Sequence, residues 1–130
     1  MAMLTLSNRP PGTKEIFEYL CECARNMYTD NYQHICEEVE KRSNGTIRII
    51  PVDIGRYLGW IRDECIKENV PWINALAVGL NNKDPDPQNR WRPSDGFLPQ
   101  RGKWEPSHEM LWRGMVLQVY SYDWNNVTIA

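Results

Sequence analysis

Residues 53–97, which decide the fold, read DIGRYLGWIRDECIKENVPWINALAVGLNNKDPDPQNRWRPSDGF. Apolar residues recur at helical spacing through 53–68, which predicts an amphipathic helix with Asp53 as its cap. Its buried stripe consists of Ile54, Leu58, Ile61 and Cys65. Pro71 prevents the helix from continuing, because proline has no N–H to donate. The apolar run ALAVGL that follows, residues 75–80, is typical of a buried strand.

A long segment without helical or strand periodicity then runs over residues 81–104. Ordered loops of that length are uncommon in compact domains and are often functional. It mixes basic, acidic and aromatic side chains, among them Lys83, Asp84, Asp86, Arg90, Trp91, Arg92, Asp95, Phe97, Arg101, Lys103 and Trp104. Arginines beside aromatic rings can contact phosphates and stack on bases, and Arg and Trp equally anchor protein interfaces. The third interpretation is an internally salt-bridged loop that tryptophan pins to the core.

Three further helices and a second strand are expected outside this stretch. Helices are predicted over 14–28 with Thr13 as cap, over 31–42 with Asp30 or Asn31 as cap, and from Ser107 onward. TIRII, residues 46–50, is β-branched enough to form a strand. The expected fold class is therefore α+β, a helix-rich single domain with a small sheet and one long loop. Residues 1–12 are expected to be an irregular arm before a domain that spans 13–130.

Composition limits the class of protein. The chain has 130 residues and a net charge of −2, which argues against a protein that coats nucleic acid over its whole surface. No run approaches the ~18 apolar residues that a membrane span needs. The N-terminal residues show no secretory signal pattern, so a cytoplasmic localisation is expected.

No standard catalytic motif is present, and we expect a chain that is not an enzyme and needs no cofactor. The two histidines, His34 and His108, are predicted to be surface or structural residues; a Cys–His nucleophile pair is the alternative, with no support beyond residue types.

The four cysteines are expected to be reduced, buried thiols in helices: Cys21, Cys23, Cys36 and Cys65. Zinc is the alternative, but Cys21 and Cys23 would point to different faces of one helix, so no metal site is predicted.

Two segments carry a family resemblance. YTDNYQHICEEVE (28–40) and GRYLGWIRDECIKENVPWINALAVG (55–79) are similar in layout to the C-terminal domain of alkylguanine DNA alkyltransferases. The chain resembles even more a set of small bacterial and phage proteins in which a Gly-Phe loop and a terminal Tyr-Asp-Trp recur, as in residues 96–97 and 122–124. The family's Pro-Cys-His-Arg motif is absent, and residues 74–78 occupy that neighbourhood, so the alkyl-transfer step does not carry over.

What the resemblance implies is a helix-turn-helix or winged-helix body, with helix 31–42 crossing the DNA backbone and helix 53–68 reading the groove. A strand with Arg48 between these helices departs from that pattern. The function expected first is a non-enzymatic nucleic-acid-binding module for DNA or RNA. The alternative is a protein-binding regulator or inhibitor from phage or bacterial defence that acts through loop 81–104. The candidate binding residues are Arg56, Arg62, Lys67, Arg90, Trp91, Arg92, Phe97, Arg101 and Trp104.

Overall fold

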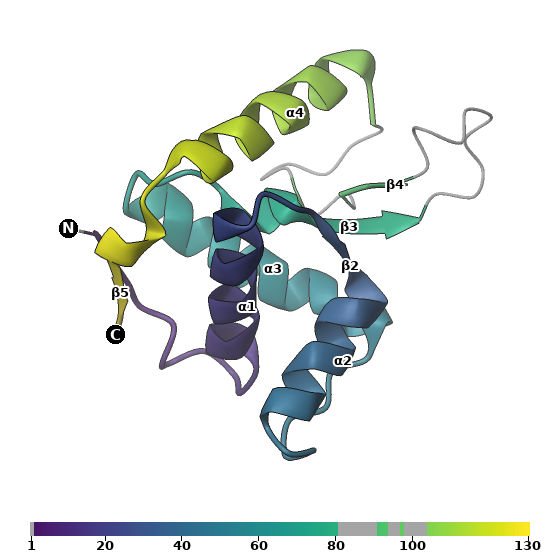
Figure 1. Ribbon diagram of the computed structural model, residues 1–130, viewed down its shortest axis with the longest axis vertical. Coiled ribbons are helices and arrows are strands. Elements are labelled where there is room, and N and C mark those ends of the chain that lie inside the picture. Colours follow the sequence, from purple (N-terminus) through teal and green to yellow (C-terminus); the bar gives the residue numbers. More distant parts are fainter. Residues whose placement is uncertain (1, 81–90, 94–96, 98–103) are drawn as a thin grey trace.

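The computed structural model describes residues 2–80, 91–93, 97 and 104–130 (Figure 1). The described helices are α1 (Thr13–Arg25), α2 (Tyr32–Arg42), α3 (Ile54–Lys67) and α4 (Pro106–Ser121). The strands are β1 (Ala2–Leu4), β2 (Asp30–Asn31), β3 (Ala77–Leu80), β4 (Trp91–Arg92) and β5 (Val127–Ile129). The described 3₁₀ helices with printed bounds are η1 (Pro51–Asp53), η2 (Ile73–Leu76) and η5 (Trp124–Asn126). This is the predicted helix-rich α+β class.

The strands form two small sheets. β1 pairs in parallel with β5, with Leu4 opposite Ile129, so the two ends of the chain lie side by side (Figure 1). β3 pairs in parallel with β2 and antiparallel with β4, with Gly79 opposite Arg92. A Cβ atom on Gly79 would lie 2.7 Å from the Tyr32 ring, so the glycine lets α2 pack against β3.

The core is built around η2. All four of its residues are buried, and α1, α3 and α4 all contact it (Figure 1). Because this backbone is buried, its polar groups need partners. The indole Nε1–H of Trp112 in α4 donates to the carbonyl oxygen of Ala75 at 2.8 Å. The backbone N–H of Trp72 donates to Sδ of Met115 at 3.3 Å, so two contacts fix how α4 lies against η2.

One predicted strand is absent, and the start of the other is shifted by two residues. Residues 46–50 are not a strand, because Ile47 donates its N–H to Oγ of Ser43 at 3.0 Å and Ile49 packs against Gly12. This segment therefore packs against the start of α1 and the end of α2. Residues 75–76 belong to η2, and the strand begins at Ala77.

Two predicted caps differ from the structure, whereas the predicted N-cap position of Asp53 at α3 is confirmed. Gly12, with φ of +107°, is the cap of α1 and Thr13 is its first residue, while the N–H of Gly12 donates to Oε1 of Glu15 at 2.9 Å. Glu105 is the N-cap residue of α4, whereas Ser107 was predicted to have that role. Asp53 precedes α3 but makes no capping hydrogen bond with its side chain. The cap of α2 is confirmed, because Oδ1 of Asn31 accepts the N–H of His34 at 2.8 Å.

The expectation of an irregular arm is wrong for residues 2–6, which lie on α3. Leu4 and Leu6 are fully buried. The Glu64 side chain, only 9% exposed, accepts the N–H of Thr5 at 3.0 Å and lies 3.5 Å from the Arg9 guanidinium. The Glu64 carboxylate of α3 thus accepts a backbone hydrogen bond from the edge of this segment that β5 does not cover.

We predict that Glu64→Ala lowers the free energy of unfolding by about 1–3 kcal/mol, because it leaves the partly buried N–H of Thr5 without its acceptor. Glu64→Gln should cost less, since an amide oxygen can still accept that hydrogen bond. Urea denaturation of both variants measures the difference, with the exposed Glu37→Ala as control. Equal losses for alanine and glutamine would contradict this role of Glu64.

Candidate functional site

The predicted basic residues of α3 do not form one exposed row. The Arg56 side chain is 68% exposed and lies 3.6 Å from the Asp53 carboxylate. The Arg62 side chain is only 14% exposed and contacts Asp63 at 2.9 Å. Arg56 and Lys67 share one face, since eleven residues make about three helical turns, while Arg62 points elsewhere. Lys67 is exposed.

Carboxylates engage most of the described arginines. Ion pairs within 4 Å join a carboxylate to Arg9, Arg42, Arg48, Arg56, Arg62 and Arg113. Exposed pairs of this kind contribute little to stability. These pairs do cancel local positive potential. A nonspecific contact with phosphates requires such a positive potential. The described surface therefore lacks a strongly basic face.

The aromatic residues predicted as a binding surface take different positions. Phe97 is buried, with its ring 5.8 Å from Trp72 and 6.3 Å from Trp104. The Arg92 guanidinium lies 5.6 Å from the centre of the Trp104 ring. Trp91, in contrast, is 46% exposed on β4. The interpretation that tryptophan holds the loop against the core is supported at Trp104. Trp91, by contrast, is exposed and can contact another molecule. Arg90 and Arg101 lie outside the described residues.

The first turn of α4 completes this cluster. Trp104 donates its Nε1–H to Oε2 of Glu109 at 3.2 Å, and its ring lies 5.7 Å from His108. Nδ1 of His108 accepts the N–H of Glu105 at 3.1 Å. His108 thus has the structural role that was predicted, at the start of α4.

The outer face of α4 is apolar, which the sequence interpretation missed. Met110 is 78% exposed, Leu117 is 65% exposed and Leu111 is 44% exposed. The opposite side of the same helix buries Trp112, Met115 and Val119. Figure 1 shows α4 across one end of the molecule, with the other elements on one side of it. Exposed apolar side chains that lie together on a surface can mark an interaction site. The signal was present in the sequence, because Met110 and Leu117 are seven residues apart and fall opposite the residues that the helical spacing predicts to point inward: Trp112, Met115, Val116 and Val119.

A cluster of titratable groups joins α1 to α2. The hydroxyl of Tyr19 and Nδ1 of His34 both bond to Oδ2 of Asp30. The Arg42 guanidinium lies 4.9 Å from the Tyr19 ring centre and makes two bonds to Glu22, at 2.7 and 3.0 Å. Burial, followed by the hydrogen bond to Asp30, raises the pKa of Tyr19. The cluster holds two helices together through groups that bond to one another.

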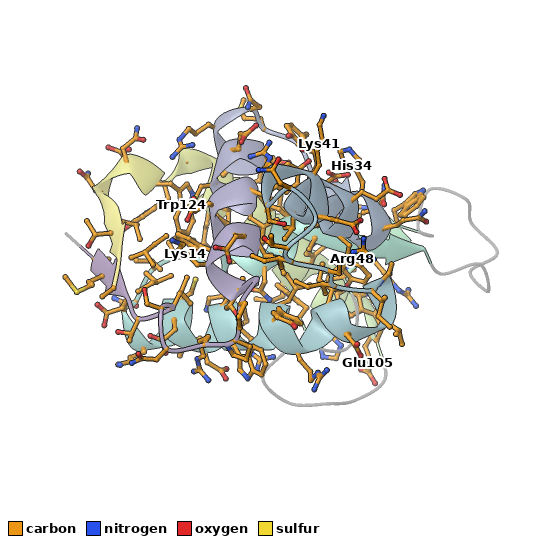
Figure 2. All side chains as sticks on the ribbon, turned by 90° about the horizontal axis from the view of Figure 1, so that it is seen from below. Lys14, His34, Lys41, Arg48, Glu105 and Trp124 are labelled. Carbon is orange, nitrogen blue, oxygen red and sulfur yellow. The ribbon has the colours of Figure 1, made fainter. Side chains whose placement is uncertain are left out.

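Described residues line at least two open clefts. A cleft of about 200 Å³ lies along residues 6–15. A second, of about 300 Å³, lies between α1 and β5, where the Trp124 ring lies 6.1 Å from the Phe17 ring. Figure 2 labels Trp124 beside α1. Within the described ranges, no group of three or more His, Cys, Asp or Glu side chains is placed to hold a metal ion. Neither cleft is lined by a histidine.

The cysteines are buried thiols, as predicted. Burial raises the pKa of Cys21 and of Cys65 to about 12. Burial likewise raises the pKa of Cys23 and of Cys36 to about 11. A nucleophilic cysteine needs a lowered pKa and access to its substrate, and these thiols have neither.

No family model matches this chain, and no curated protein and no solved structure is significantly similar to it. No helix in the described part of the chain is long and apolar enough to cross a bilayer.

We predict that His34 titrates above its ordinary value. The hydrogen bond to Asp30 is the main cause of its raised pKa, against a smaller effect of desolvation. Because the pKa is higher in the folded state, the pair stabilises the fold fully below about pH 6.5 and loses that contribution as the pH rises through the folded-state pKa. An NMR titration of the imidazole, assigned by its loss in His34→Gln, measures the shift. The variant should also flatten the pH dependence of stability in that window. A His34 pKa at or below its ordinary value would contradict the pairing.

We also predict that the four thiols of the folded chain react slowly with a disulfide reagent such as Ellman's reagent. In denaturant all four should react at the rate of free cysteine, because burial and the raised pKa are both lost. The ratio of the two rates is the measurement. A thiol that reacts at the free rate in the native protein would show an accessible site.

Proposed function

We propose that this chain is a binding module without a catalytic role, and that its ligand is a polypeptide held on the outer face of α4. The observation that carries the proposal is the exposure of Met110, Leu111 and Leu117 on one side of a helix whose other side is already packed. Covering an exposed leucine or methionine side chain gains up to about 1.5–3 kcal/mol.

The chemistry of this face restricts the partner. Six of its outward side chains carry no formal charge, and the exposed Arg113 at the edge of the face is paired with Glu109 at 2.9 Å: the uncharged residues are Ser107, Met110, Leu111, Leu117, Gln118 and Ser121. A highly charged ligand would lose hydration here and gain no counter-charge. The partner therefore presents an uncharged, largely apolar surface, as a second helix does. Trp91 extends the exposed apolar surface on β4.

An alkyltransferase-like module that binds nucleic acid is less well supported. It would use Arg56, Lys67 and Trp91 as phosphate and stacking contacts. Most described arginines already bond to carboxylates, and the arginine of α3 that was expected to contact phosphate, Arg62, is largely buried. The helix-turn-helix assignment stays a prediction, and nucleic-acid binding is an outcome that the experiment below can reveal.

We predict that Leu117→Glu abolishes capture of the partner by the tagged chain. A carboxylate at this position would have to lose its hydration inside an apolar contact. The matched control is Val52→Glu, which places the same charge at another exposed apolar position, 83% exposed on η1. Capture from the cells that naturally contain the chain should survive Val52→Glu and nuclease treatment. Circular dichroism confirms that both variants fold.

Two results would overturn the proposal. The first is capture that Leu117→Glu leaves unchanged. The second is capture that nuclease removes, together with saturable binding of single- or double-stranded oligonucleotides at low salt. That pair of observations would favour the nucleic-acid module.

A further inference from the structure

We infer that the outer edge of β5 is a second binding surface, which pairs with an extended peptide segment of a partner protein in the cleft between β5 and α1. This surface is distinct from the outer face of α4 and makes a different kind of contact, so the inference goes beyond the proposed function. Three features support it: the unpaired backbone of β5, the cleft beside that backbone and the charges at the rim of the cleft.

One edge of β5 has no strand beside it. In the described part of the chain, β5 belongs to a sheet of two strands, so β1 is its neighbour on one side only. The N–H of Ala130 donates to the carbonyl oxygen of Leu4 at 2.8 Å, which fixes the side that Ala130 turns to β1. Alternate residues of a strand direct their polar groups to the same side. Val127 and Ile129 therefore turn theirs away from β1.

The outward groups of β5 have the pattern that another extended backbone satisfies. The N–H of Val127 is already used, because it donates to the carbonyl oxygen of Trp124. The N–H of Ile129 and the carbonyl oxygens of Val127 and Ile129 have no hydrogen-bond partner among the described residues. An exposed edge of this kind is a template for a further strand. A peptide that adds to it can satisfy the donor and both flanking acceptors at once.

The cleft of about 300 Å³ lies beside this edge, and Val127 and Ile129 line it. Figure 1 shows β5 at one side of the molecule, with α1 next to it. Across the cleft from β5 the lining includes apolar side chains, those of Phe17 and Cys21 in α1, with Trp124 beside them. Successive side chains of a strand point to opposite faces, so every second side chain of an added peptide meets this lining. The backbone pairing then supplies attachment, and the cleft supplies selectivity.

The charges at the rim of the cleft favour an acidic side chain in the peptide. Arg42 is already engaged, because its guanidinium bonds to Glu22 at 2.7 and 3.0 Å. Glu18 lies 3.9 Å from the Lys14 ammonium. Arg25 is exposed at the same rim, and no carboxylate in the described ranges lies within ion-pair distance of it. A carboxylate of the peptide supplies the counter-charge that Arg25 lacks.

The first test asks which peptides the full chain selects. The probe is a library of random heptapeptides displayed on phage. Selected peptides should be enriched in acidic residues, because Arg25 has no counter-charge within the chain. Selection against Arg25→Glu should enrich basic residues instead. The same acidic enrichment with both proteins would overturn the assignment to this cleft.

The second test asks whether the peptide pairs with the backbone of β5. Binding of a synthetic selected peptide should slow hydrogen exchange of the Ile129 amide, measured by NMR. Ile129→Pro removes only an outward N–H, a position where an edge strand tolerates proline. It should weaken binding about tenfold, because the peptide carbonyl loses its donor. Ile129→Ala is the matched control: it loses the same side chain but keeps the N–H, so it should bind more tightly than the proline variant. Fluorescence anisotropy of the labelled peptide measures both, and circular dichroism confirms folding.

The outcomes separate this surface from α4. Peptides whose binding is abolished by Leu117→Glu and unchanged by Ile129→Pro would support the proposed function and overturn the inference. A library that yields no binder, or a bound peptide that leaves exchange at Ile129 unchanged, would also overturn it. If Leu117→Glu leaves protein capture unchanged while Ile129→Pro and Arg25→Glu alter peptide binding as expected, the proposed function fails and the inference stands.

Discussion

The buried backbone of η2 is the constraint on which the rest of the structure depends. A 3₁₀ helix at the centre of a core exposes no polar group to water, so neighbouring elements must supply partners. Trp112 supplies one at the carbonyl of Ala75. That bond sets the rotation of α4 about its own axis, with Trp112, Met115 and Val119 inward. Met110 and Leu117 point outward as a direct consequence. The candidate interface is therefore positioned by a hydrogen bond on the opposite side of the helix.

Ionic groups in this chain chiefly connect its own elements. Asp30 joins α1 to α2 through Tyr19 and His34, and His34 remains at the surface of α2 (Figure 2). Glu64 joins the N-terminal segment to α3. Charges that are paired in this way are less able to attract a distant anion. Because the arginines are engaged internally while the apolar side chains of α4 are exposed, association through apolar contact is better supported than attraction to phosphates.

The described thiols and histidines are engaged within the fold. The thiols are buried with raised pKa values, and both histidines bond to groups of their own helix or its flank. A general base has to reach a substrate in a pocket. The clefts found here are open and lack a histidine. An exposed apolar helix needs no pocket, and it can act by contact area alone.

The sequence alone determined the helix-rich α+β class, three of the helices within a few residues, and the burial of the cysteines, because these follow from local periodicity. It did not determine that residues 46–50 lack a strand partner or that residues 2–4 pair with β5, since strand pairing depends on segments far apart in the chain. Nor could periodicity separate the buried Phe97 from the exposed Trp91 within one loop. The spacing of Trp112, Met115 and Val119 did predict which face of α4 points inward, and the structure buries all three side chains. Only the tertiary structure showed what that face packs against, because the hydrogen bond from Trp112 to the buried carbonyl of Ala75 forms only when η2 and α4 are packed together.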